Sequence, residues 1–177
     1  MKKKTDKNTR WITTITVLSF VISLILSLIS QLVIPNTFLL VNILLVLLFI
    51  FLGIIFDIIG LAVTTADPKS FHSMATQKVK GSKQAIKLIN NKTKVSSFCN
   101  DVIGDICGVI SGSCGLTISL KISEIFNFNN IIVTLLVTSI ISALTIGGKA
   151  VGKKVAVNKS NEIVYRVTKF LTLFSKK

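Results

Sequence analysis

Three aspartates, Asp57, Asp101 and Asp105, lie inside long apolar stretches of this 177-residue chain. A carboxylate at the centre of a lipid-embedded helix costs roughly 2.5–3.5 kcal/mol to insert, so three of them cost on the order of 8–10 kcal/mol. A chain that only had to sit in a membrane has little reason to keep them. Hard cations such as magnesium take oxygen ligands, usually one or two carboxylates plus waters. The three aspartates therefore predict a site for a cation or a proton.

Two of these aspartates stand in a row of glycines. Asp101, Gly104, Asp105, Gly108 and Gly112 recur at three- and four-residue spacing, so an α-helix would place them on one face. The glycines form two overlapping G-x-x-x-G motifs, which let another helix approach closely and favour self-association as a homodimer. The alternative interpretation is a packing face whose aspartates only hydrogen-bond to a neighbouring helix.

Neighbouring stretches supply further oxygen atoms for the same site. Asp57 lies near one end of the second stretch and Asp101 near the start of the third, so antiparallel helices bring them to similar membrane depth. In the fourth stretch, Thr138 and Ser142 share a helical face and are predicted to assist as metal ligands. Hydroxyl rows are also common packing features of membrane helices. Mg²⁺ or a similar cation is the expected transported ligand, and no permanently bound cofactor and no enzymatic activity are predicted.

Four apolar helices must position these residues. The chain is 50% hydrophobic and only 16% charged, whereas a soluble domain carries about 25% charged residues. The stretches at 11–34, 38–66, 97–120 and 130–148 are each long enough, or nearly so, to cross about 30 Å of hydrocarbon. The predicted fold class is an all-α integral membrane protein with four transmembrane helices. The first stretch exceeds the usual signal-peptide core, which favours a retained anchor over a cleaved one.

The net charge of +14 follows the loops between these stretches. Lysine and arginine gather in residues 1–10, between the second and third stretches, and after the fourth, and only Lys121 falls on the other side. The positive-inside rule then predicts a multi-pass protein of the cell (inner or plasma) membrane with both termini cytoplasmic. Since topology explains the clustering, the expected partner is a bilayer with anionic headgroups and not nucleic acid.

Two segments outside the spans have amphipathic patterns. Residues 67–95 predict a helical hairpin, in which Asp67 caps a first helix and Gly81-Ser82 separates it from a second. Residues 160–174 predict a helix with one apolar face. Both are expected to lie on the cytoplasmic leaflet. Trp11 and Tyr165 fit an interfacial aromatic belt.

From about residue 45 to 174, the order of these features resembles the transmembrane domain of the CorB/CorC and cyclin-M magnesium transporter family. The segments that carry the resemblance are IFDIIGLAV at 55–63, GSKQAIKL at 81–88, Gly104-Asp105, and GKAVGK at 148–153. The chain departs from the family's pattern: Lys149 and Gly60 stand where the family has glutamates, and Asp57 stands where it has a serine that ligates metal. Residues 11–34 form an additional span, and no nucleotide-binding CBS pair follows residues 38–174.

The resemblance implies divalent-cation transport, with Asp57 and Asp101 as carboxylates of a relocated site and Asp105 as a further ligand. A non-transporting membrane scaffold or regulatory subunit, built on a degenerate domain of this type, is the alternative. A third hypothesis is proton- or sodium-coupled movement of another solute through the same carboxylates.

Overall fold

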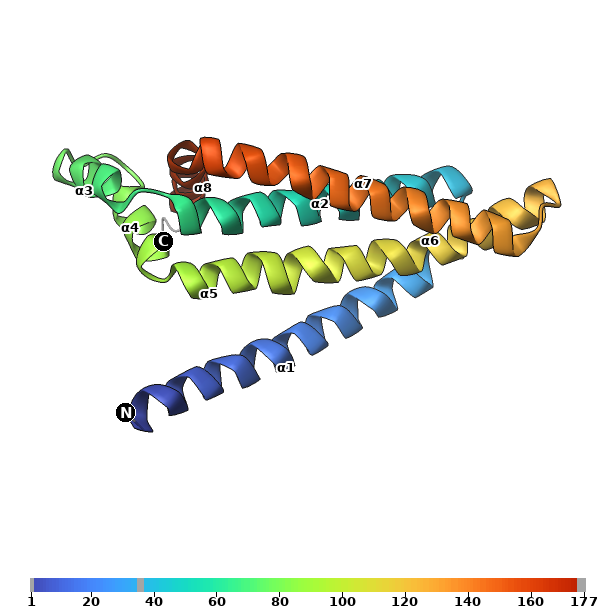
Figure 1. Ribbon diagram of the computed structural model, residues 1–177, viewed down its shortest axis with the longest axis horizontal. Coiled ribbons are helices and arrows are strands. Elements are labelled where there is room, and N and C mark those ends of the chain that lie inside the picture. Colours follow the sequence, from blue (N-terminus) through green and yellow to red (C-terminus); the bar gives the residue numbers. More distant parts are fainter. Residues whose placement is uncertain (1, 35–36, 175–177) are drawn as a thin grey trace. The chain divides into compact units, whose positions relative to one another are not determined.

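The computed structural model describes residues 2–34 and 37–174, which are helical almost throughout and contain no strand. Figure 1 shows the order of the helices along the chain. The elements are α1 (Lys2–Val33), α2 (Leu39–Thr65), α3 (Pro68–Thr76), α4 (Ser82–Asn90), α5 (Lys92–Ser96), the π-helical segment η1 (Ser97–Gly104), α6 (Asp105–Phe126), α7 (Asn130–Asn158) and α8 (Ser160–Phe174).

Four helical segments of the described chain are long and apolar enough to cross a membrane, which confirms the predicted class of membrane protein. They are Thr9–Val33, Leu39–Thr65, Lys92–Phe126 and Asn130–Asn158. Two helices continue beyond the predicted membrane spans. Residues 2–10 continue α1 rather than preceding it, and α7 runs past residue 148 to Asn158. In both places polar residues such as lysine, which are good helix formers, prolong a helix that the apolar pattern alone would end.

The helices form two compact units, and both α2 and α7 contribute to each. The first unit comprises Met1–Leu52 and Asp105–Thr145. Its centre is α6, whose Ile110, Cys114 and Ile118 are buried. The hydroxyls of Ser119 and Thr134 lie 2.9 Å apart and join α6 to α7. This unit holds most of the length of the apolar helices.

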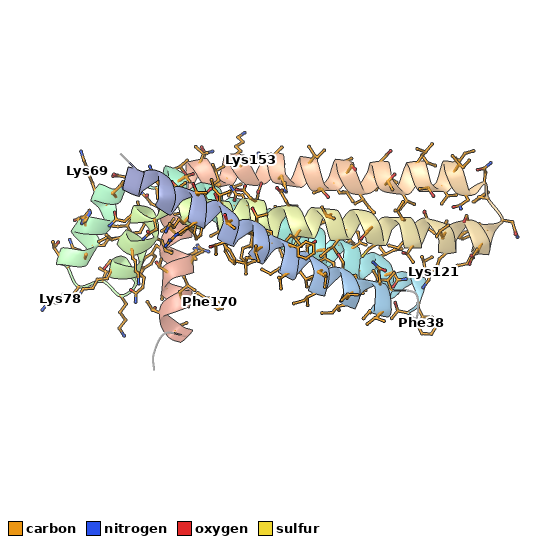
Figure 2. All side chains as sticks on the ribbon, turned by 90° about the horizontal axis from the view of Figure 1, so that it is seen from below. Phe38, Lys69, Lys78, Lys121, Lys153 and Phe170 are labelled. Atoms are coloured by element: carbon orange, nitrogen blue, oxygen red, sulfur yellow. The ribbon has the colours of Figure 1, made fainter. Side chains whose placement is uncertain are left out.

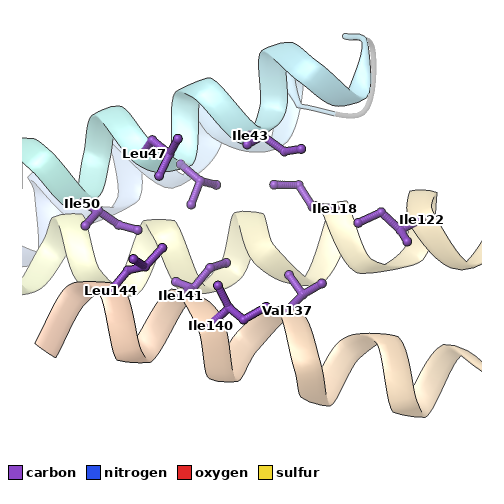
Figure 3. A pocket seen from close by; sticks show the side chains of 10 residues that line it. Ile43, Leu47, Ile50, Ile118, Ile122, Val137, Ile140, Ile141 and Leu144 are labelled. Carbon is purple, nitrogen blue, oxygen red and sulfur yellow. The ribbon is translucent and has the colours of Figure 1, made fainter. Parts of the chain in front are cut away.

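Between α2, α6 and α7 the first unit contains an apolar cavity of about 180 Å³. Figure 3 shows branched aliphatic side chains from the three helices converging on it. Its lining includes Ile43, Leu47, Ile118, Val137 and Leu144. No polar side chain lines this cavity, so the three helices meet around it through apolar side chains alone.

The second unit comprises Gly53–Gly104 and Ile146–Lys177 and has a core of its own. Here α3 and α4 form a hairpin, and α4 packs against α8 (Figure 1). Small and apolar side chains from five helices meet in this core. They are Ala62 and Val63 of α2, Ala66 directly after α2, Phe71 of α3, Ala85 and Ile89 of α4, Ala156 of α7, and Val164 of α8.

Local sequence signals set the first residues of α3 and α4. The Asp67 side chain accepts a hydrogen bond from the Lys69 N–H at 3.0 Å, and Pro68 occupies the first helical position of α3. Gly81 has a φ of +92° before α4, a conformation that glycine adopts without the strain of a side chain. The backbone of α8 passes close to Gly81, since a Cβ there would lie 3.4 Å from the Lys169 nitrogen.

The apolar face predicted for the hairpin has protein partners, whereas Phe170 and Leu171 of the face predicted for α8 are exposed. Phe71, Ala85 and Ile89 are almost completely buried in the core of the second unit. In α8 the buried side chains are Val164 and Thr168, which the predicted apolar face did not include. The hairpin therefore uses its apolar face to fold against the chain.

Candidate functional site

Asp57 is a buried carboxylate inside the apolar helix α2. Asp57 is only 7% exposed and belongs to the second unit. The space for it exists because residue 104, on η1, is a glycine. A Cβ on Gly104 would lie 3.4 Å from Asp57 Oδ1 and 3.7 Å from the Gly53 carbonyl oxygen. Asp57 therefore lies beside η1, while the prediction that it shares a membrane depth with Asp101 stays a prediction.

The charged partner of Asp57 is Lys149 of α7. Lys149 Nζ lies 3.9 Å from Asp57 Oδ1, and the two side chains are 20% and 10% exposed. Charge-assisted hydrogen bonds between an ammonium and a carboxylate are about 2.7–2.9 Å long. The two groups therefore attract each other without forming a close hydrogen bond at this distance, although Lys149 has a further contact. Together they bring a neutral pair of charges into the apolar helices.

An amide oxygen near this part of α2 has no hydrogen-bond partner. Asn100 of η1 donates from Nδ2 to Ser96 Oγ at 3.3 Å, while its Oδ1 atom is buried and unsatisfied. That oxygen lies directly against Gly60, because a Cβ on Gly60 would come within 2.0 Å of it. Stretches of π-helix are rare and occur frequently at functional sites. The second unit thus carries a buried carboxylate and a buried amide oxygen where α2 meets η1.

The other two predicted ligand carboxylates are exposed. Asp101 lies in η1 and Asp105 is the first residue of α6, where Asp105 makes a contact of its own. Across residues 2–34 and 37–174, no three His, Cys, Asp or Glu side chains group in a way that would hold a metal ion. The three aspartates therefore do not form a single carboxylate cage in the described chain.

Neither of the two α7 hydroxyls that were predicted as metal ligands faces Asp57 through a hydrogen bond given by the structure. Thr138 donates to the Thr134 carbonyl oxygen at 2.7 Å, one turn earlier in its own helix. Ser142 is exposed. A Thr hydroxyl that bonds to its own backbone is satisfied without a ligand. Their role as metal ligands stays a prediction.

The three glycines predicted to pack against another helix have different surroundings. Gly104 is buried and faces Asp57, whereas a Cβ added at Gly108 or Gly112 would meet no atom within 4 Å. Gly115, outside the predicted set, lies against Ile141 so closely that a Cβ would come within 2.4 Å of its Cδ1 atom. Of the predicted set, only Gly104 has a close neighbour among the described residues.

The predicted aromatic belt residues are both partly covered by protein. Trp11 of α1 is half-buried. Tyr165 of α8 packs against the core of the second unit. An interfacial position for either ring stays a prediction.

A second lysine site, absent from the sequence-based predictions, closes the connection between α1 and α2. Lys121 Nζ donates to the carbonyl oxygens of Ile34 and Thr37 at 2.8 and 2.7 Å. The Asn42 amide also donates to the Ile34 carbonyl at 2.9 Å and hydrogen-bonds through its oxygen to the Thr37 hydroxyl. Figure 2 shows Lys121 at the same end of the first unit as Phe38. A single asparagine in the apolar run of the second stretch was the available signal, since a fully buried amide needs partners.

Comparison of the chain with protein-family models, with curated proteins and with solved structures found no match. The fold and the site therefore define a class, an all-helical protein with four helices able to span a membrane. The resemblance to the CorB/CorC and cyclin-M family stays a prediction.

Proposed function

We propose that this protein binds and transports a cation within the membrane, magnesium or a similar divalent ion, at a site built around Asp57. The observation that carries the proposal is the buried Asp57 carboxylate facing Lys149 Nζ at 3.9 Å. A carboxylate at this depth is costly and marks ion pathways when it is found in membrane helices. Its charged partner, Lys149, carries its ammonium on a flexible stem, and an incoming cation can replace that ammonium.

The oxygen atoms beside α2 support a cation as the ligand. The Asp57 carboxylate and the unsatisfied Asn100 Oδ1 are the carboxylate and amide ligand types that hard cations prefer. A hydrated ion bound to one carboxylate keeps several of its waters, as magnesium usually does. When the ion leaves, the return of the Lys149 ammonium keeps Asp57 neutralised. The exposed Asp101 and Asp105 attract cations to the helix without completing the cage.

The membrane arrangement belongs to the same proposal. Both termini are cytoplasmic in the cell (inner or plasma) membrane, which follows the distribution of lysine and arginine along the chain. The basic residues of the α3–α4 hairpin and of α8 lie against anionic lipid headgroups. No enzymatic step and no permanently bound cofactor are part of the proposal.

Magnesium flux into proteoliposomes tests the transport proposal. We expect the magnesium flux with native protein to exceed that of empty liposomes. Asp57→Asn should reduce the flux at least about tenfold, the equivalent of about 1.4 kcal/mol. Glu124→Gln is the matched control, because Glu124 is an exposed carboxylate near the end of α6. Native flux equal to that of empty liposomes would reject transport. Loss of flux in Asp105→Asn with full flux in Asp57→Asn would show that the site is at Asp105 and not at Asp57.

A second candidate, a non-transporting membrane scaffold or regulatory subunit, is favoured by one observation. Lys149 neutralises Asp57 without any bound ion. For this candidate we expect no flux from native protein, and recovery of a stoichiometric partner when the chain is isolated from native membranes. Flux from the native chain without such a partner would reject it.

A further inference from the structure

The helices α1 and α6 border a polar cavity where they meet. Figure 1 shows this contact near the C-terminal end of α1. The cavity measures about 320 Å³, and small-molecule sites in proteins typically measure about 300–1,000 Å³. Its polar lining consists of Ser30, Gln31, Ser113, Cys114 and Thr117. The cavity therefore has room for a small ligand, or for one polar group of a larger one.

Two polar groups in this lining are available to a ligand. Ser30 hydrogen-bonds with the Cys114 thiol, and the Ser113 hydroxyl donates to the backbone of its own helix at 2.9 Å. The Gln31 amide and the Thr117 hydroxyl make no hydrogen bond with another residue of the described chain. The serines of α6 all donate to carbonyl oxygens of their own helix, so Thr117 is the exception among the hydroxyls of α6.

Both available groups can donate a hydrogen bond, and both belong to apolar segments able to span a membrane. Gln31 lies in the segment Thr9–Val33 and Thr117 in Lys92–Phe126. A polar group that has no partner in hydrocarbon is costly, since no water is present there to bond with it. A carbonyl oxygen has two lone pairs and can accept from both donors at once. The lining therefore favours a ligand that carries a carbonyl oxygen.

The surroundings of the cavity favour an uncharged ligand with an apolar part. Among the described residues, no charged side chain lines it. Leu116, which also lines the cavity, is exposed, as are Leu28 and Leu120, each one turn along its helix from a lining residue. A polar cavity beside exposed leucines fits an amphiphile, whose polar group enters the cavity while its apolar chain covers the leucines.

Lys121 places the cavity near one end of the spans. Its Nζ atom donates to the Ile34 carbonyl oxygen at 2.8 Å, so the two residues lie at one level. Thr117 and Ser30 precede them by one helical turn, about 6 Å at 1.5 Å per residue. The headgroup layer of a bilayer is about 5–7 Å thick on each side of the hydrocarbon. Since an ammonium favours that layer, the cavity lies where the layer meets the hydrocarbon, which is where lipid ester groups are found.

We propose that this cavity binds a membrane lipid, with the Gln31 amide and the Thr117 hydroxyl donating to an ester carbonyl oxygen of the lipid. One acyl chain then lies along the exposed leucines of α1 and α6. The ester group is common to lipids with different headgroups, so binding does not depend on the headgroup. The site belongs to the first unit and is independent of Asp57 and of cation transport.

Two lipids that differ only at the ester test this site. Dioleoyl phosphatidylcholine and its dialkyl ether analogue share the headgroup and the chain length, but the ether has no carbonyl oxygen. Native mass spectrometry of the full chain in detergent measures the dissociation constant of each lipid. Two hydrogen bonds of ordinary strength correspond to about tenfold in affinity, so we expect the native protein to bind the ester lipid about tenfold more tightly.

Gln31→Leu and Thr117→Val each remove one donor and keep a side chain of similar size. We expect each variant to lower the ester preference to about threefold, and the double variant to abolish it. Binding of the ether lipid should stay unchanged. Thr16→Val is the matched control, because the exposed Thr16 of α1 donates to its own helix at 2.9 Å. This control should keep the tenfold preference.

Three results would overturn the proposal. The first is equal affinity of the native chain for the two lipids, which a water-soluble occupant of the cavity would produce. The second is an ester preference that the double variant retains. The third is loss of the preference in Thr16→Val, since that residue does not line the cavity.

Discussion

Two lysines enter the apolar helices of this protein, and their surroundings differ in kind. Lys121, in the first unit, donates to two neutral carbonyl oxygens at 2.7 and 2.8 Å. Lys149, in the second unit, stands 3.9 Å from the charged Asp57 carboxylate. One ammonium is held closely by the backbone, and the other is attracted more loosely by an opposite charge.

The difference separates a structural lysine from an exchangeable one. Carbonyl oxygens at the end of a helix need a donor, and Lys121 supplies it for the connection between α1 and α2. A carboxylate needs only a positive charge, which an ion supplies as well as a lysine does. The comparison therefore predicts that a cation replaces Lys149 in its role and does not replace Lys121.

The largest effect is expected for Lys149→Met, which leaves the Asp57 carboxylate buried without its opposite charge. Removing one partner of a buried ion pair costs about 3–5 kcal/mol. In detergent with a chelator present, the free energy of unfolding should fall by an amount at the lower end of this range, since the pair is partly exposed. Magnesium at about 100 times its dissociation constant should restore about 2.7 kcal/mol.

Lys153→Met is the control for this variant, because Lys153 is an exposed lysine on the same helix. It should change stability little with or without magnesium. An equal loss in chelator and in magnesium for Lys149→Met would contradict an exchangeable site at Asp57.

A smaller loss is expected for Lys121→Met. The variant leaves the Ile34 and Thr37 carbonyl oxygens without their charged donor, and hydrogen bonds to charged groups are worth about 1.5–3 kcal/mol. Because Asn42 still donates to Ile34, we expect about 2 kcal/mol in the same unfolding measurement. If magnesium restored the stability of Lys121→Met, the prediction that a cation replaces Lys149 but not Lys121 would be contradicted.

The smallest of the three effects is expected for Gly60→Ala, which probes the packing beside Asp57. The new Cβ would come within 2.0 Å of Asn100 Oδ1, so the Asn100 side chain must move. Overpacking of this kind costs about 1–3 kcal/mol. Asn100→Ala in the same chain should recover most of the loss. Gly147→Ala, with open space around it, should cost nothing.

Much of the fold follows from patterns that act locally. Apolar stretches predict the four long helices, because a segment that crosses a membrane must satisfy its backbone hydrogen bonds internally. Asp67-Pro68 and Gly81 predict the ends of α3 and α4 because capping and positive φ depend on those residues themselves. The end of α7 at Asn158 could not be predicted in this way, because lysine occurs in helices as well as in the loops that follow them.

The site was predictable only in part. The antiparallel order of the second and third stretches predicted similar depths for Asp57 and Asp101, but it did not identify Gly104 as the neighbour of Asp57. The shared face of Asp101 and Asp105 was inferred from α-helical spacing, yet Asp101 lies in the wider turns of η1, where that spacing does not hold. The pairing of Asp57 with Lys149 depends on the length of α7 and on its packing, and both are properties of the tertiary structure.

The apolar cavity between α2, α6 and α7 opens to the outside of the first unit. Three of the side chains that line it, Leu47, Ile140 and Leu144, are also exposed. An apolar group that approaches from outside, such as part of a lipid chain, can therefore enter its roughly 180 Å³. No hydrogen bond in the lining has to break for such a guest to bind.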